Sequence, residues 1–230
     1  MTGSPAPDDL SGVPARLADV RRRIASCSID PDGVRIVAVT KGFGASAVAS
    51  ALAAGLVDIG ENYADELVEK ARVAGSGRGD DPVPIWHFLG AVQRNKVARL
   101  APVVTWWQGV SRIEEGRAIA TRSPGSTVLA QIDLAGIPGR GGCPPDRVSD
   151  LVSALRDEEL DVAGLMGVGP PGPPEAARVG FAGLSTLADA LDLPVRSMGM
   201  TDDLEVAVSE GSTMVRLGRA LFGDRPARIG

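Results

Sequence analysis

Apolar residues recur along this chain with two spacings, one typical of buried strands and one typical of amphipathic helices. Short runs rich in Val, Ile and Leu predict eight strands, at residues 34–40, 57–60, 85–89, 103–108, 127–132, 162–166, 195–198 and 213–217. Helical spacing between them predicts helices at residues 45–54, 62–74, 93–100, 113–121, 145–158, 175–191 and 202–209. One more helix is predicted ahead of the first strand, over residues 9–26.

Regular alternation of strands and helices predicts a parallel sheet, and closing eight strands into a barrel leaves no exposed sheet edge. We therefore expect an α/β fold, a single (β/α)8 TIM-type barrel with an extra N-terminal helix, over residues 9–230. Residues 1–8 are rich in Pro, Gly and Ser and are expected to be a disordered lead-in. Two Gly/Pro-rich stretches, 136–145 and 167–174, are expected to be loops over one mouth of the barrel.

Composition supports this fold and excludes several functions. Hydrophobic residues make up 44% of the chain but aromatic residues only 3%, which suits a tight core of small aliphatic side chains. The net charge of −5 argues against nucleic-acid binding, and we interpret the run Arg21-Arg22-Arg23 as the solvated side of the first helix. Cys27 and Cys143 are too far apart in sequence to suggest a metal site and are expected to be reduced thiols.

Location and assembly are also expected from these features. The chain has no signal-like apolar start and no run of about 18 apolar residues, so a soluble, cytoplasmic protein without membrane contact is expected. Its acidic charge and the lack of an obvious exposed apolar stripe favour a monomer.

Lys41 is the first candidate for chemistry, because it follows the β-branched run at residues 34–40 and precedes a glycine-containing turn. Ligands of parallel α/β folds lie at the C-terminal ends of strands. Alternation places Val37, Val39 and Lys41 on one face, and partial burial there would favour the free amine, a nucleophile that forms imines with aldehydes. The alternative is a strand-end lysine that is simply solvated.

The last two strands end in segments suited to a phosphate. Arg216 shares a face with Met214 and would lie beside Lys41, because the first and last strands of a closed barrel are neighbours. Gly218 and Arg219 begin a short helix whose N–H groups can bind an anion, and Met200 and Thr201 follow the seventh strand. A lysine beside a phosphate cradle suggests pyridoxal phosphate.

Several residues have two interpretations at this stage. Thr201 could donate to a phosphate oxygen, cap a helix, or do both, and Asn62 could reach the same ligand or act only as a helix N-cap. Asp202 and Asp203 would complement the positive end of the following helix. The sole histidine, His87, is expected to be a hydrogen-bonded core residue.

Taken together, the motifs closely resemble those of the YggS/PROSC family of pyridoxal phosphate-binding proteins. The matching segments occur in the family's order between residues 34 and 223, and they are Thr40-Lys41, Gly60-Glu61-Asn62-Tyr63, Trp86-His87-Phe88-Leu89-Gly90, Gln93, Asn95-Lys96, Gly164-Leu165-Met166, Met198-Gly199-Met200-Thr201-Asp202-Asp203 and Gly211-Ser212-Thr213-Met214-Val215-Arg216-Leu217-Gly218. The resemblance implies a barrel similar to the N-terminal domain of alanine racemase, with pyridoxal phosphate attached to Lys41.

By the same resemblance, Arg216 would face the pyridine nitrogen, and Thr201 and the backbone at Gly218 and Arg219 would hold the phosphate. This chain departs from the family in two places. Arg219 stands where the family commonly has Thr, and the loop after the fifth strand, residues 133–140, has Arg140 where the family usually carries a lysine.

The leading functional hypothesis is a non-catalytic pyridoxal phosphate-binding protein that buffers or delivers the cofactor, with cofactor-dependent apo-enzymes as partners. An amino-acid racemase is the alternative, but it needs a proton-transfer group on each face of its substrate. Only Tyr63 is available as a tyrosine. A third hypothesis, a class I aldolase, would need an acid or base, for which Asp133 and Glu61 are the candidates.

Overall fold

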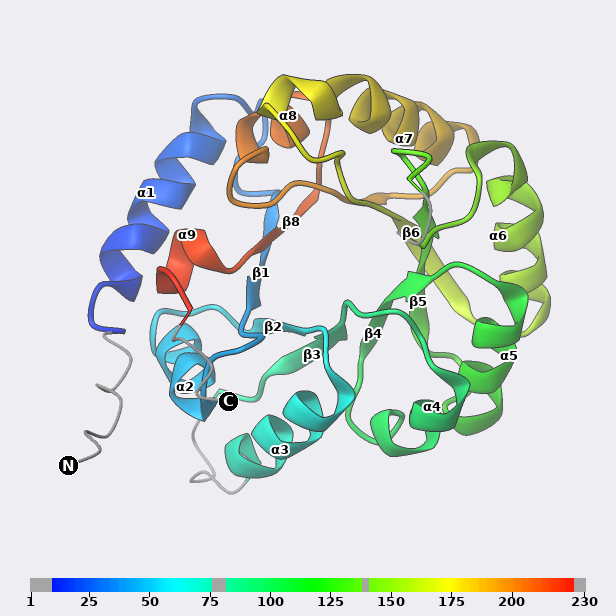
Figure 1. Ribbon diagram of the computed structural model, residues 1–230, viewed down its shortest axis with the longest axis horizontal. Helices are drawn as coiled ribbons and strands as arrows, with labels where there is room; N and C mark the ends of the chain where they lie inside the picture. The colour runs from blue at the N-terminus through cyan, green and yellow to red at the C-terminus, as the bar shows by residue number, and fades with distance from the viewer. Residues whose placement is uncertain (1–9, 76–81, 138–140, 226–230) are drawn as a thin grey trace.

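The computed structural model describes residues 10–75, 82–137 and 141–225, and these form a closed parallel barrel of eight strands in sequence order (Figure 1). The predicted barrel is therefore confirmed, whereas the predicted lead-in at residues 1–8 lies outside the described residues. The strands are β1 (Arg35–Val39), β2 (Asp58–Glu61), β3 (Ile85–Phe88), β4 (Trp106–Val110), β5 (Thr127–Ile132), β6 (Asp161–Gly167), β7 (Val195–Ser197) and β8 (Met214–Leu217).

A ring of helices surrounds these strands (Figure 1). The helices are α1 (Val13–Ala25), α2 (Ala45–Ala53), α3 (Ala64–Ala74), α4 (Arg94–Leu100), α5 (Ile113–Arg122), α6 (Val148–Asp157), α7 (Arg178–Ala190), α8 (Leu204–Ser209) and α9 (Arg219–Phe222). The predicted extra N-terminal helix is α1. Since α9 is only four residues long, α1 covers it from outside and completes the ring between α8 and α2.

The barrel closes where β1 pairs with β8, with Val37 opposite Arg216. Side chains of these strands alternate between two cores. Val37 and Met214 pack with Leu129 and Met166 inside the barrel, whereas Val215 joins the larger core between the strands and the helices. The alternation predicted from the sequence is thus confirmed, and it directs β1 and β8 side chains into the barrel.

Several element boundaries differ from the prediction because hydrogen bonds end elements before the apolar pattern does. Strand β4 begins at Trp106, not at residue 103, because the N–H groups of Val103 and Val104 both donate to the carbonyl of Leu100 in a turn. The predicted helices 145–158 and 175–191 each begin with a short 3₁₀ turn, Pro145–Arg147 and Pro174–Ala177.

Cys27 and Cys143 are both free thiols, as expected. Within the described part of the chain, no helix has the length and apolar character needed to cross a membrane.

Candidate functional site

A cavity of about 450 Å³ opens at the C-terminal ends of the strands, between β1, β2 and β8. All seven residues predicted to bind the cofactor line it, namely Lys41, Asn62, Met200, Thr201, Arg216, Gly218 and Arg219. Val39, Leu89 and Met166 supply apolar walls. Small-molecule sites typically occupy about 300–1,000 Å³ and combine apolar walls with a few polar groups, so this cavity has the size and lining of a ligand site.

Lys41 follows the last residues of β1, and its side chain is partly buried in the cavity wall. Burial is the largest cause that lowers the pKa of Lys41, and the positive charges of Arg225 and Arg216 lower it further. Both causes disfavour the ammonium form. The structure therefore favours the neutral, nucleophilic amine at this position more than solvent would.

The residues next to Lys41 in the chain bond to a buried cluster of charged side chains. Lys70 Nζ donates to Glu61 Oε1 at 2.5 Å and to the carbonyl oxygen of Thr40 at 2.7 Å. Thr40 Oγ1 donates to Glu61 at 2.6 Å, and the N–H of Gly42 donates to Glu66 at 2.8 Å. The residues on both sides of Lys41 in the chain are thus fixed by side chains of β2 and α3.

Arg216 is a buried cation that enters the cavity from β8. Its Nη1 donates to the carbonyl oxygen and to Oγ of Ser197 at 2.6 and 2.9 Å, and its Nη2 donates to the carbonyl oxygen of Gly167 at 2.8 Å. Burial lowers the pKa of Arg216 to about 10, which still leaves the guanidinium charged at neutral pH. The barrel therefore orients the guanidinium through three hydrogen bonds from Nη1 and Nη2.

The opposite rim is built from the segments that follow β7 and β8. Thr201 Oγ1 accepts a hydrogen bond from the N–H of Ala220 at 3.1 Å, which ties the two segments together. Arg219 forms an ion pair with Asp202, with Nη2 2.6 Å from Oδ2. Because Arg219 and Asp202 are both exposed, their ion pair lies on the solvent-facing edge of the cavity and contributes little to stability.

Helix α1 braces this rim from outside. Arg23 Nη2 donates to the carbonyl oxygen of Thr201 at 3.0 Å, and its Nε donates to Glu205 at 2.6 Å. Arg16 Nε donates to the carbonyl oxygen of Leu221 in α9 at 2.6 Å. The interpretation of Arg21-Arg22-Arg23 as a solvated run is therefore wrong for Arg23, which turns inward because a carboxylate and a carbonyl are within its reach.

Two predicted helix caps are also wrong. Helix α3 begins at Ala64 with Tyr63 at the N-cap position, so Asn62 does not cap it and lines the cavity instead. Helix α8 begins at Leu204 with Asp203 at the N-cap position, and Asp203 Oδ1 accepts from the N–H of Met200. Thr201 therefore bonds the first turn of α9, across the rim. Gly55, which follows α2, has a left-handed φ of 81°.

The sequence interpretation missed residues that support the site from a distance. His87 is a hydrogen-bonded core residue as expected, with Nε2 2.8 Å from Asp58. Lys70, Gln108 and Ser197 were not singled out, although each is a buried polar or charged side chain. Two signals in the sequence could have found them. Lys70 lies on the apolar face of a predicted helix, and Gln108 lies within a predicted strand. Polar groups at such positions are buried only when they have partners.

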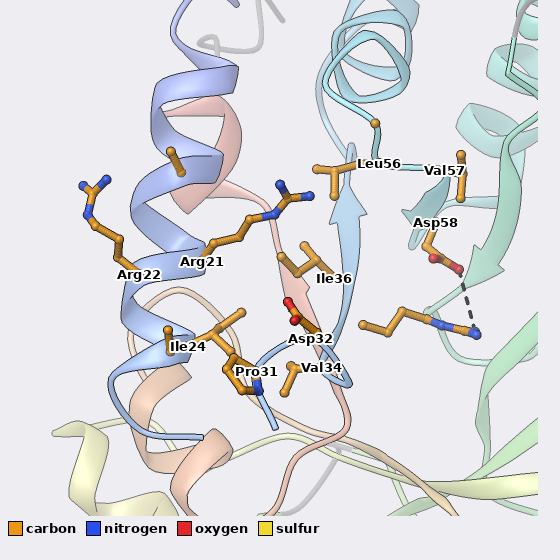
Figure 2. Close-up of a pocket in the computed structure, with 14 residues that line it drawn as sticks. Arg21, Arg22, Ile24, Pro31, Asp32, Val34, Ile36, Leu56, Val57 and Asp58 are labelled. Carbon is orange, nitrogen blue, oxygen red and sulfur yellow. Dashed lines mark ion pairs between the residues drawn. The ribbon is translucent and has the colours of Figure 1, made fainter. Parts of the chain in front are cut away.

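The structure has a second and larger cavity, of about 680 Å³, at the opposite end of β1 and β2 (Figure 2). Helix α1 lines one side of it with Arg21, Arg22 and Ile24, and the start of β2 lines the other with Asp58. In barrels of this kind the chemistry takes place at the C-terminal ends of the strands. The smaller cavity around Lys41 is therefore the candidate functional site.

The fold and the position of this site define a class of barrel. Residues 15–226 match the family described as "Alanine racemase, N-terminal domain". Individual relatives point to a more specific family within that class. The chain is 36% identical to the "Pyridoxal phosphate homeostasis protein" of Pseudomonas aeruginosa, over 95% of each chain. It is 33% identical to the protein of that name from Escherichia coli K12, over 94% of this chain and 98% of the relative.

A solved structure agrees with these relatives. PipY of Synechococcus elongatus, in the structure described as having PLP bound, is 27% identical and superposes with a TM-score of 0.79 over 92% of this chain and 100% of PipY. The chain therefore belongs to the pyridoxal phosphate homeostasis protein family, within the wider class of alanine racemase N-terminal barrels. The family resemblance inferred from the motifs is confirmed.

Proposed function

We propose that this protein binds pyridoxal phosphate in the cavity around Lys41 and acts in the homeostasis of that cofactor without catalysing a reaction of its own. The names of its relatives and the cofactor in PipY support this assignment. The observation that carries it is the convergence of Lys41, Arg216 and the Thr201–Arg219 rim on one cavity of suitable size. We further propose that the protein buffers the cofactor or delivers it to apo-enzymes, and that it does so as a monomer in the cytoplasm.

The residues that line the cavity fit both the aldehyde and the phosphate of this cofactor. Pyridoxal phosphate supplies an aldehyde that reacts with amines and an aromatic ring that withdraws electrons. Lys41 would anchor the aldehyde carbon, because its lowered pKa supplies the free amine. Thr201 and the start of α9 at Gly218 and Arg219 would hold the phosphate, with Met200 and Asn62 beside it.

Arg216 is the residue we propose to suppress catalysis. A guanidinium whose pKa stays at about 10 keeps its proton, so it can donate a hydrogen bond to the ring nitrogen but not protonate it. An unprotonated ring withdraws electrons weakly, which disfavours the removal of a proton from a bound amino acid. The buried position of Arg216, fixed by Ser197 and Gly167, makes this effect permanent.

The enzymatic alternatives have less support. Tyr63, the sole tyrosine of the chain, is half exposed and does not line the cavity, so a racemase would lack its obvious second proton-transfer group. For an aldolase, Glu61 is already bonded to Lys70 and Thr40, and Asp133 accepts from the N–H groups of Ala135 and Gly136. Asp133 and the Oε1 atom of Glu61 are therefore occupied by structural bonds.

Borohydride trapping tests the assignment, and the chain suits the method because it has only three lysines, Lys41, Lys70 and Lys96. We expect protein incubated with pyridoxal phosphate to turn yellow, and after reduction to carry one cofactor on Lys41, by peptide mass spectrometry. A Lys41→Ala variant should stay colourless, and a Lys96→Ala variant should behave like the parent. Attachment only to Lys96, or none, would refute cofactor binding, whereas rapid racemisation of alanine or serine would refute the non-catalytic role.

A further inference from the structure

A line of buried polar side chains crosses the barrel interior from Arg216 to the opposite end of the strands. Arg216 Nη1 lies 2.9 Å from Ser197 Oγ, and Ser197 Oγ lies 2.7 Å from Gln108 Oε1. Gln108 Nε2 lies 2.7 Å from His87 Nδ1, and His87 Nε2 lies 2.8 Å from Asp58 Oδ1. These side chains come from β8, β7, β4, β3 and β2, so the line crosses the barrel interior between β7 and β4.

Along this line, each side chain can donate its hydrogen bond to the next one, in the direction from Arg216 to Asp58. Arg216 can only donate, so Ser197 accepts from it and donates its own hydroxyl proton to the carbonyl oxygen of Gln108. The amide nitrogen of Gln108 donates to Nδ1 of His87, which leaves the proton of a neutral imidazole on Nε2, facing Asp58. Aligned bonds of this kind polarise one another, so the line works as a unit.

The surroundings favour the neutral histidine that this arrangement needs. Burial lowers the pKa of His87, and Asp58 offsets this effect only in part. The ring of Trp106 stacks on His87 with centroids 5.5 Å apart and so restricts its rotation. Gln108, Ser197 and His87 are all buried, so breaking one bond would leave a polar atom without solvent to replace its partner.

The far end of the line reaches solvent. Asp58 lines the larger cavity at the start of β1 and β2, where its side chain remains 14% exposed (Figure 2). Arg35, 3.8 Å from Asp58, lies over the ring of Trp106, so the last carboxylate of the line is itself held on two sides. A charge accessible from one end of the barrel is thus connected to the buried cation at the other.

We propose that Gln108, His87 and Asp58 are positioning residues for Arg216, through which the carboxylate at one end of the barrel sets how firmly the cofactor is held at the other. This inference rests on the proposed function, because it concerns the same cavity. It assigns a role to side chains that do not line the cofactor cavity and that a purely local description of the site would treat as core.

Two substitutions test the line at different depths. Gln108→Met keeps the volume and removes the hydrogen bonds of Gln108 to His87, Ser197 and Met214. Asp58→Asn removes the charge at the far end with almost no change in shape. We expect Gln108→Met to weaken cofactor affinity roughly tenfold, because it breaks the line in the interior. We expect a smaller loss, roughly threefold, for Asp58→Asn, because the amide oxygen can still accept from His87 but carries no charge. Asp32→Asn is the matched control, because Asp32 lines the same cavity as Asp58 but is not part of the line.

Cofactor dissociation constants, the absorption maximum of the bound cofactor and the thermal unfolding of the cofactor-free protein should be measured together. A positioning role predicts that Asp58→Asn shifts affinity and absorption maximum in the same direction as Gln108→Met, although Asp58 lies at the opposite end of the barrel. A merely structural role predicts lower unfolding temperatures with an unchanged absorption maximum, and that result would overturn the inference, as would equal effects of Asp58→Asn and Asp32→Asn. Should Gln108→Met fail to fold, Asp58→Asn alone decides between these outcomes.

The two proposals can fail separately. If the parent protein takes up no pyridoxal phosphate, the proposed function fails and the inference falls with it. If the parent binds the cofactor on Lys41 and both variants bind it equally well with the same absorption maximum, only the positioning role is wrong.

Discussion

Lys70 Nζ lies 2.7 Å from the carbonyl oxygen of Thr40, the residue immediately before the proposed anchor Lys41. A buried lysine therefore holds the backbone next to the partly buried Lys41. The arrangement is costly unless its charges are paired, and Glu61, with a fully buried side chain, supplies the partner. Burial raises the pKa of Glu61, which the neighbouring Lys70 partly offsets.

Removing the charge of Lys70 should destabilise the protein and disturb Lys41. We expect Lys70→Met to cost about 3–5 kcal/mol of unfolding free energy, because Glu61 would remain buried without its cation. Denaturant unfolding measures this loss. The double variant Glu61→Gln/Lys70→Met should recover part of it, and additive losses in the double variant would show that the two side chains do not act as a pair.

Lys41 should react with acylating reagents at lower pH than an ordinary lysine. Burial and two nearby cations lower its pKa, so its labelling should reach half of the maximum rate below about 10.4, the usual value for lysine. Lys96, on the surface helix α4, is the internal control within the same protein. Rates followed by peptide mass spectrometry should rise first at Lys41, and identical pH profiles for the two lysines would contradict this account.

The same shift predicts how stability depends on pH. The folded cofactor-free protein releases the Lys41 proton more readily than the unfolded chain, so it binds fewer protons between the lowered pKa and the ordinary one. The destabilising contribution of Lys41 is fully present below its folded pKa and is lost as pH rises from that value to the ordinary pKa of lysine. Lys41→Met should therefore stabilise the cofactor-free protein near neutral pH, with a benefit that shrinks in alkaline solution.

Arg23 should matter for the cofactor although it belongs to α1. Arg23→Ala removes the bonds to Thr201 and Glu205, so we expect a cofactor affinity lower by roughly three- to tenfold. Arg22→Ala is the matched control, because Arg22 is exposed and pairs with exposed Asp19 on the same helix. Isothermal titration of the cofactor into both variants tests this prediction. If only the loss of a positive charge mattered, Arg23→Ala and Arg22→Ala would weaken binding equally.

Close packing of β6 against β7 should make Gly164 irreplaceable. A Cβ at Gly164 would lie 2.0 Å from the backbone oxygen of Val195, which neither strand can relieve without moving. We expect Gly164→Ala to cost about 1–3 kcal/mol or more. Gly183, in the exposed interior of α7, has open space around its Cβ position, and Gly183→Ala should be neutral or stabilising by up to about 1 kcal/mol in the same unfolding experiment.

The fold could be predicted from the sequence because strand and helix periodicities leave local traces. Alternation fixed the inward face of β1 and β8, and hence the placement of Lys41 and Arg216 in one cavity. Helix starts were harder, since Asn62 and Thr201 are good cap residues whose actual partners depend on neighbouring segments. The loop at residues 136–145 was anticipated as irregular, but Arg140 lies outside the described residues.

By itself, the order of residues determined the barrel, the inward alternation of its strands and the identity of the amine and guanidinium at its mouth, because these depend on periodicity and on closure of a parallel sheet. Only the tertiary structure decided which polar groups pair. Lys70 with Glu61, Arg23 with Thr201, and Gln108 with His87 and Ser197 join elements far apart in sequence, and buried hydrogen bonds depend on distances that no local pattern encodes.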